Sequence, residues 1–321
     1  MNMINMEIFA VILFLCCKFR AEAEGLSYNF YDQSCPQVEN IVRAGLQSAS
    51  LIDPTTPSAV LRLLFHDCQV EGCDASILLD PDNIRTQYSE MASPKNFGIR
   101  KRELINNIKS NVEAICPQKV SCSDILVMAA REAVALSGGP RISVPLGRRD
   151  SNKAPDFKLA DALLPSADFG VDSMLHLFSK KGLTVEESVA ILGAHTLGIT
   201  HCTNLQSRLY NSNNKATNLV HENILRMICP VGSSETTFVP NDLTSLLFDN
   251  HYFINTLRGH GVLKIDAEMP LDPRTGPYVK TFGDDQEAFF KAFSSAFVKI
   301  SNSDVLIGNQ GVIRRRCNER N

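Results

Sequence analysis

Residues 61–80 read LRLLFHDCQVEGCDASILLD, the densest run of side chains that could carry chemistry in the chain. The pattern predicts a helix over 57–66, with Thr56 as its expected N-cap. On such a helix Arg62 and His66 lie four residues apart and project from one face. Leucines surround them, so their polar groups need charged or hydrogen-bonding partners if they are buried. A surface arginine beside a core histidine is the plain alternative.

Oxygen ligands follow this helix directly. Asp67, Asp74 and Ser76 belong to an irregular loop that contains glycine and that Cys68 and Cys73 could close with a disulfide. Carboxylate, hydroxyl and carbonyl oxygens suit calcium better than a transition metal. The spacing and the terminal glutamate of an EF-hand are missing. The loop therefore predicts a calcium site of another kind.

A second histidine occupies a similar position in 189–202, VAILGAHTLGITHC. His195 shares a helical face with Ile191 and Leu192, and the small residues just before it would let a flat molecule approach. A histidine that simply packs in the core is the alternative. Two histidines, each at the end of an apolar helix and one with an arginine a turn away, favour a different interpretation. One would ligate a metal while the other transfers protons opposite it.

Length and composition narrow the class of protein. The chain has 321 residues, enough for one large domain or two small ones. Hydrophobic residues make up 44% and charged residues 21%, which excludes a disordered chain. The formal net charge of −3 gives no electrostatic case for binding nucleic acid or an anionic membrane. Trp is absent, so no mechanism that needs an indole can operate.

The cysteines and the N-terminus indicate secretion. An apolar run of ten residues over 8–17 is too short to span a bilayer, and the small-residue pattern Ala21-Glu22-Ala23 follows it. We expect a signal peptide over 1–23, with an uncleaved anchor as the alternative. The eight cysteines beyond it predict four disulfides, whose pairing spacing alone does not decide. They are Cys35, Cys68, Cys73, Cys116, Cys122, Cys202, Cys229 and Cys317.

The rest of the chain reads mostly as helix, so the expected class is mainly α. Residues 103–115, 122–136, 184–195 and 286–300 show helical periodicity, and Thr184 with Glu187 forms a capping box. Strand signals are weak and short, around 142–146 and 305–307. Long loops over 77–99, 151–170, 204–218, 230–250 and 266–280 are typical of functional or ion-binding segments.

The mature chain resembles a secretory haem peroxidase of the plant type (class III). The motifs RLLFHDCQVEGCDASILL, VSCSDIL, PLGRRDS, GAHTLGITHC and FDNHYF occur in order, and the similarity extends from Tyr31 to Cys317. The resemblance implies a mainly α-helical haem peroxidase fold of about ten or more helices, with minimal β-structure. Distal and proximal halves would enclose noncovalent haem b within a single domain over 24–321. It also implies the disulfides Cys35–Cys116, Cys68–Cys73, Cys122–Cys317 and Cys202–Cys229.

The resemblance assigns the distal residues to hydrogen peroxide chemistry. His66 would take a proton from H₂O₂ and return it to the departing oxygen, and Arg62 would stabilise the charge that develops there. Phe65 would shape the pocket, and Asn96 would fix the tautomer of the histidine. The surrounding SEMASPKNFGIR, however, departs from the usual family pattern. Small phenolic donors would be oxidised in one-electron steps at the haem edge, which Pro165 borders.

The resemblance further implies a proximal pair and two calcium ions. His195 would be the axial iron ligand, and Asp266 would accept a hydrogen bond from it. The distal calcium would use Asp67, Asp74 and Ser76 with carbonyls of Asp67, Val70 and Gly72, and Glu90 through water. The proximal calcium would use Thr196, Asp242, Thr244 and Asp249, with Asn241 a weaker candidate than Asp242. Asp124 and Arg148 match a buried ion pair with a structural role.

The implied protein is a secreted monomer, delivered to the cell wall or the vacuole, that binds no nucleic acid or membrane. Divergence at Gln69 and in the segments 91–100 and 239–249 motivates an alternative. Under it the chain is a calcium-stabilised extracellular binding or structural protein that has lost catalysis.

Overall fold

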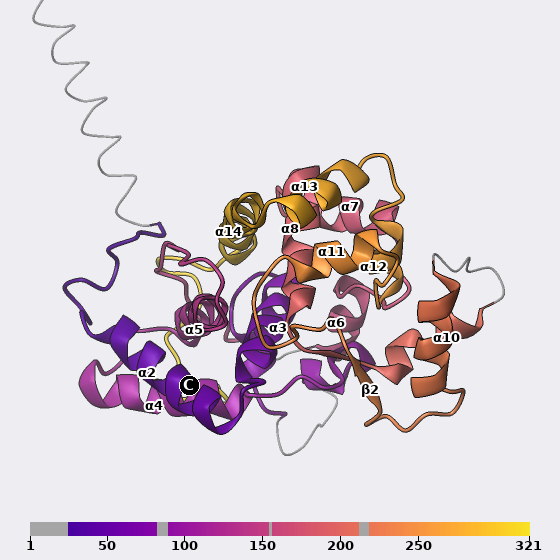
Figure 1. Ribbon diagram of the computed structural model, residues 1–321. Coiled ribbons are helices and arrows are strands. Elements are labelled where there is room, and N and C mark those ends of the chain that lie inside the picture. Colours follow the sequence, from indigo (N-terminus) through magenta and orange to yellow (C-terminus); the bar gives the residue numbers. More distant parts are fainter. Residues whose placement is uncertain (1–24, 82–88, 154–155, 212–217) are drawn as a thin grey trace, which may run out of the picture.

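The computed structural model describes residues 25–81, 89–153, 156–211 and 218–321 (Figure 1). The expected signal peptide over 1–23 lies outside these ranges. Within them the chain forms thirteen α-helices, five short 3₁₀-helices and one two-stranded sheet. The mainly α class with minimal β-structure is therefore confirmed.

The elements have the following bounds. The α-helices are α2 (Val38–Ile52), α3 (Thr56–Gln69), α4 (Arg102–Ile115), α5 (Cys122–Leu136), α6 (Phe157–Leu163), α7 (Val171–Ser179), α8 (Val185–Leu192), α9 (Gln206–Tyr210), α10 (Leu219–Ile228), α11 (His251–Leu257), α12 (Lys264–Glu268), α13 (Gly276–Asp284) and α14 (Gln286–Asn302). The 3₁₀-helices are η1 (Ser76–Leu78), η2 (Glu90–Ala92), η3 (Pro94–Asn96), η4 (Gly193–Thr196) and η5 (Cys202–Leu205), and the strands are β1 (Ile199–His201) and β2 (Phe238–Pro240).

Side-chain N-caps account for the starts of five of the described α-helices: α5, α6, α8, α10 and α14. The predicted capping box of α8 is present, since Thr184 Oγ1 accepts from the Glu187 amide and the Glu187 carboxylate accepts from the Thr184 amide. The expected N-cap of α3 was wrong by one residue, because Thr55 takes that position. Thr56 is already helical, and its hydroxyl donates to the Ala49 carbonyl of the preceding helix.

The predicted strands are wrong. The segment 142–146 alternates because Ile142, Val144 and Leu146 are buried against the core, although only Leu146 forms an isolated bridge, with Ser27. The segment 305–307 is irregular. The sheet is instead β1 paired antiparallel with β2, in a register that sets Thr200 opposite Val239. Three of the expected loops also contain short helices, α6, α9 and α12, which are too brief to show a clear helical period.

Three hydrophobic clusters hold the described helices together, the smallest of them Val70 with Ala160 and Leu164. The largest is built around α5, which is buried along almost its whole length, with α3 packed on it; α14 packs on α8 and α11 on α13. In Figure 1, α3 lies at the centre of the molecule and α10 at its margin. We call the cluster that is next in size the second core; it consists of Cys202, Leu205, Leu209, Leu225, Cys229, Val239 and Val262.

Four disulfides cross-link the fold, in the same pairs that the family resemblance implies: Cys35–Cys116, Cys68–Cys73, Cys122–Cys317 and Cys202–Cys229. Each typically adds about 2–4 kcal/mol to stability by restricting the unfolded chain. The Cys122–Cys317 bond joins the start of α5 to the C-terminal segment across a sequence separation of 195 residues. Within the described ranges, no helix has both the length and the apolar character needed to cross a bilayer.

Candidate active site

Arg62 and His66 of α3 lie next to Asn96 of η3. The Arg62 Nε donates to His66 Nε2 at 3.2 Å, and the distance from His66 Nδ1 to Asn96 Oδ1 is 2.7 Å. Asn96 Nδ2 donates to the Glu90 carbonyl at 2.8 Å, which turns the amide oxygen toward the histidine. Since that oxygen can only accept, the proton of the neutral imidazole sits on Nδ1. His66 Nε2 therefore carries the lone pair, which accepts the hydrogen bond from Arg62 Nε.

The surroundings keep this histidine uncharged. His66 is buried at 9% exposure. Burial, reinforced by the positive charge of Arg62, lowers the pKa of His66 to about 3, although the hydrogen bond to Asn96 opposes the shift. Burial also lowers the pKa of Arg62 to about 10, so the guanidinium is still a cation near neutral pH. The site therefore combines a neutral proton acceptor with a fixed positive charge.

The neighbours of Arg62 fix its position. Its NH2 group donates to the Phe97 carbonyl at 3.0 Å. The next residue, Gly98, has φ of +77°, and a Cβ built there would lie 3.3 Å from the Arg62 guanidinium. Phe65 is half-buried and meets Phe178 of α7 edge to face, with ring centroids 6.2 Å apart. The distal helix is thus braced on one side by a tight loop and on the other by an aromatic contact.

The second histidine lies in η4, directly after α8. His195 Nδ1 is 3.0 Å from Asp266 Oδ1, and the side chain of His195 retains 29% exposure while that of Asp266 is buried. Tyr252 donates its hydroxyl to Asp266 Oδ1 at 2.7 Å, and the Leu263 amide donates to Oδ2 at 2.8 Å. Burial alone would raise the pKa of Asp266, but His195 and these hydrogen bonds outweigh it and lower the pKa. Asp266 therefore holds His195 through Nδ1 and leaves its other ring nitrogen able to bind a metal.

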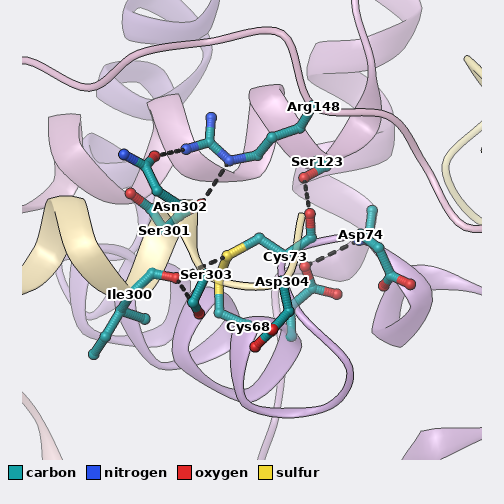
Figure 2. The surroundings of a disulfide bond; sticks show 12 residues. Cys68, Cys73, Asp74, Ser123, Arg148, Ile300, Ser301, Asn302, Ser303 and Asp304 are labelled. Carbon is teal, nitrogen blue, oxygen red and sulfur yellow. Dashed lines mark hydrogen bonds between the residues drawn. A yellow bond between two sulfur atoms is a disulfide. The ribbon is translucent and has the colours of Figure 1, made fainter. Parts of the chain in front are cut away.

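The disulfide Cys68–Cys73 closes the loop after α3 (Figure 2). Ser123 of α5 donates its hydroxyl to the Cys73 carbonyl at 2.6 Å. Gly72 has φ of +108°, and a Cβ at this position would come within 2.1 Å of the Asp304 carbonyl oxygen. Only glycine fits there. The loop is therefore packed between α5 and the residues that follow α14.

The predicted distal calcium residues converge on this loop. Asp67 accepts from the amide of Ala75 at 3.0 Å, and Asp74 accepts from the amide of Ser76 at 2.9 Å. The carboxylates of Asp67, Asp74 and Glu90 are all buried, and Glu90 Oε2 has no hydrogen-bond partner. Burial raises the pKa of each, that of Glu90 to about 8, and their mutual repulsion adds to the shift of Asp67. Crowded buried acids with an unpartnered oxygen suit a cation.

The predicted proximal residues also come together. Thr196 Oγ1 lies 2.8 Å from Asp242 Oδ2 and 3.2 Å from Asp249 Oδ1, and Thr244 Oγ1 lies 3.1 Å from the same Asp249 oxygen. Asn241 instead accepts from the Thr200 hydroxyl at 2.7 Å and donates to the Leu197 carbonyl. The geometry therefore favours Asp242 over Asn241 as the carboxylate of this set.

Both oxygen-rich sets depend on hydroxyl and carbonyl groups. In the part of the chain that the structure describes, no three His, Cys, Asp or Glu side chains converge closely enough to hold a metal ion by themselves. A calcium ion, which takes six to eight oxygens, would draw on backbone carbonyls and hydroxyls as well.

The remaining residues to place are Asp124, Arg148, Pro165 and Tyr252. Arg148 NH1 donates to Asp124 Oδ1 at 2.9 Å with both side chains fully buried, in agreement with the expected structural ion pair. Pro165 follows α6 and is half-buried. Sequence reasoning gave no role to Tyr252, which contacts Asp266. The only available signal was its place in the motif FDNHYF, because the contact spans elements that the chain order does not connect.

Comparisons with known proteins agree with this geometry. A family model described as Peroxidase matches residues 38–285. Peroxidase 29 of Arabidopsis thaliana is 52% identical over 97% of this chain and 95% of its own length. Peroxidase 12 and Peroxidase 9 of the same plant are each 40% identical, over 93% and 90% of this chain and 83% and 85% of their own lengths. Because the relatives are plant peroxidases and the match spans nearly the whole chain, this protein belongs to the peroxidase family as a class III plant peroxidase.

Proposed function

We propose that this enzyme is a secreted, calcium-stabilised haem peroxidase in which Arg62, His66 and Asn96 activate hydrogen peroxide and His195 binds the haem iron. Membership of the family implies haem, calcium, peroxide and a reducing donor. The observation that carries the assignment is the hydrogen-bond chain from Arg62 through His66 to Asn96. It gives a neutral imidazole a defined tautomer beside a permanent cation.

The residues present fit a haem. His195 is partly exposed, and its Nδ1 faces a buried carboxylate, which leaves Nε2 as the nitrogen for iron. Phe65 is likewise half-buried on α3, as is Arg62 three residues before it, which is expected of residues that line an accessible space. We assign one noncovalent haem b, with His195 as its axial ligand. When bound, the haem would supply the iron that binds peroxide and the two electrons needed to break the O–O bond, and it would recover those electrons from the donor.

His66 acts as the proton carrier. Once Arg62 Nε releases Nε2, the lone pair there takes the proton of incoming hydrogen peroxide, and the imidazolium that results returns it to the outer oxygen, which leaves as water. Asn96 keeps Nδ1 protonated throughout and so directs the exchange to Nε2. Arg62 places positive charge where negative charge develops on the leaving oxygen. Burial strengthens both effects because water does not screen them.

On the other side, Asp266 controls the donor strength of His195. A buried carboxylate that accepts from Nδ1–H increases the electron density on the ring. Tyr252 shares the same Asp266 oxygen and therefore limits how strongly that oxygen accepts from His195. His195 and Tyr252 thus compete as donors for one oxygen of Asp266, and this competition sets the strength of the hydrogen bond from His195.

We assign two calcium ions to the oxygen-rich sets. The distal ion would be bound by Asp67, Val70, Gly72, Asp74 and Ser76, with Glu90 through water. The unpartnered Glu90 Oε2 supports that assignment. The proximal ion would be bound by Thr196, Asp242, Thr244 and Asp249, whose oxygens already lie within 2.8–3.2 Å of one another. The distal ion would hold the end of α3 directly beside His66.

Small phenolic donors are the proposed reductants, with Phe65 restricting access to the iron and Pro165 bordering the exposed haem edge. We further propose a signal peptide over 1–23, a single domain over 24–321, secretion to the cell wall or vacuole, and a monomer. Four disulfides support passage through an oxidising compartment. The alternative of a binding protein without catalysis is not supported, since the relatives are named peroxidases.

The test of the residue roles is a His66→Ala variant of the holoenzyme. It should retain the haem absorption band but react with hydrogen peroxide at least about 100-fold more slowly in stopped-flow measurements. His176→Ala, an exposed histidine on α7, is the matched control and should react normally. A His66→Ala enzyme that reacts at a near-normal rate would remove His66 from its assigned role.

A further inference from the structure

Two histidines meet far from the residues assigned to catalysis. His221 belongs to the first turn of α10, and His260 follows α11, so they come from different elements. Their ring centroids are 5.0 Å apart, with an angle of 32° between the ring planes. His221 Nε2 is buried and has no hydrogen-bond partner. A buried ring nitrogen of this kind normally has one, so the missing partner calls for an explanation.

The separation of the two rings matches joint ligation of one ion. Zn–N bonds measure about 2.0–2.1 Å and a ring centre lies about 1.1 Å beyond its nitrogen, so two imidazoles at a tetrahedral angle have centres about 5 Å apart. We propose that His221 and His260 form a binding site for a divalent transition-metal ion, Zn²⁺ in the first instance. Water would complete the coordination, because no third His, Cys, Asp or Glu ligand joins them among the described residues.

The chemistry of the pair selects the class of metal. The buried Nε2 of His221 has no hydrogen-bond partner, so it can present its lone pair to an ion. Neutral imidazole favours zinc, copper and nickel over calcium. Arg208 is paired with Glu222 at 2.9 Å, and Arg226 lies 3.6 Å from the same carboxylate. With only two protein ligands, binding should be weaker than at a four-ligand zinc site.

The ion would connect two parts of the fold. The helix α10 carries Leu225 of the second core, whereas His260 belongs to the turn between α11 and α12. Hydrogen bonds already link these parts. Asn218, the N-cap of α10, donates to the Arg258 carbonyl at 3.2 Å. Arg208 of α9, which pairs with Glu222 of α10, donates to the Gly261 carbonyl at 2.6 Å. A metal held by His221 and His260 would cross-link the same two elements through side chains.

Equilibrium dialysis of the holoenzyme, made without a histidine tag, tests the proposal. About 10 μM zinc in the presence of about 2 mM calcium keeps the oxygen-rich sites filled with calcium, because zinc prefers nitrogen ligands. Metal analysis should then find up to one zinc per chain in the parent enzyme. His221→Ala and His260→Ala should each lose at least about tenfold of this zinc, because one remaining imidazole binds much more weakly. His176→Ala should bind as the parent does.

An unchanged haem absorption band and peroxide rate in both variants would show that they are folded, since neither residue belongs to the catalytic set. No zinc on the parent enzyme would overturn the proposal. So would undiminished zinc on either variant, because that outcome would place the ion elsewhere. Loss in both variants with retention by His176→Ala would establish the shared site.

Discussion

His66 Nδ1 lies 2.7 Å from Asn96 Oδ1, although 30 residues separate them in the chain and they belong to different elements. The contact exists because Asn96 is buried in η3 and its amide nitrogen is already committed to the Glu90 carbonyl. The orientation of the histidine in α3 is therefore determined by the loop that follows the distal calcium residues. The peroxide chemistry proposed for His66 would depend on how well that loop is held.

Replacement of Asn96 should slow the reaction with peroxide without loss of haem. In Asn96→Ala the proton of His66 is free to move to Nε2, where it blocks the lone pair. We expect a decrease of about 10- to 100-fold in the second-order rate with H₂O₂, which is part of the usual contribution of a general base. Stopped-flow spectroscopy measures this rate. Asn107→Ala, on the exposed face of α4, should behave like the parent enzyme, and equal rates in the two variants would contradict the role of Asn96.

Replacement of Tyr252 should alter the iron ligand without disturbing the fold. Tyr252→Phe removes the hydroxyl that donates to Asp266 Oδ1, so this oxygen becomes a stronger acceptor for His195. We expect a more negative iron reduction potential and a stronger bond between iron and His195, visible in resonance Raman spectra. Tyr278→Phe is the control, since Tyr278 lies on α13 away from this network. An unchanged potential would show that Tyr252 only fills space.

Removal of calcium should destabilise the distal half first. Without the cation, the buried carboxylates of Asp67, Asp74 and Glu90 repel one another, and they must take up protons or separate. Exhaustive chelation should lower the melting temperature, and the rate with peroxide should fall before the helices unfold. Circular dichroism and stopped-flow measurements on the same sample separate the two events. Added calcium should restore both properties, and insensitivity to chelation would argue against bound calcium.

Glu187 should make the stability of the fold depend on pH in the acid range. Burial alone would raise its pKa, but hydrogen bonds from Lys299 and Thr184 outweigh this and lower the pKa to about 2. Its stabilisation is therefore complete above the ordinary value near 4.5 and disappears as the pH falls toward 2. We expect Glu187→Gln to lose about 1–2 kcal/mol at pH 6 and to show a flatter decline in stability below pH 4.5.

Urea unfolding at pH 6 and pH 3 measures this effect. The exposed neighbour in the same turn provides the control, Glu186→Gln, which lacks these contacts. The stabilities of the parent enzyme and Glu187→Gln should converge as the pH falls. A constant difference between them at both pH values would mean that the charge of Glu187 is irrelevant.

Sequence patterns predicted the parts of this fold that local chemistry determines. The helix α5 was expected with its observed bounds, 122–136, because its apolar residues recur at helical spacing; the structure adds a cap at Ser121. The prediction of the strands was wrong for a physical reason. Alternating apolar residues at 142–146 are buried against the core as a single extended segment, whereas β1 and β2 pair through backbone groups that composition does not reveal.

The candidate site likewise has parts that the sequence predicts and parts that it does not. Arg62 and His66 could be grouped from their spacing of four on one helix, but the contact of Tyr252 with Asp266 could not be foreseen. Which of Asn241 and Asp242 joins the proposed proximal calcium set could also be decided only from the structure. Adjacent residues in an irregular loop point in directions that depend on the backbone angles, and here only Asp242 faces Thr196.

The contact between Gly72 and the Asp304 carbonyl, together with the Cys122–Cys317 bond, has a consequence for how the enzyme is made. The loop that carries the distal calcium residues is completed by a segment more than two hundred positions later in translation. A ribosome synthesises the N-terminal part first. The loop can therefore reach its final packing only after the segment from Asp304 to Cys317 has been synthesised and its disulfide with Cys122 has formed.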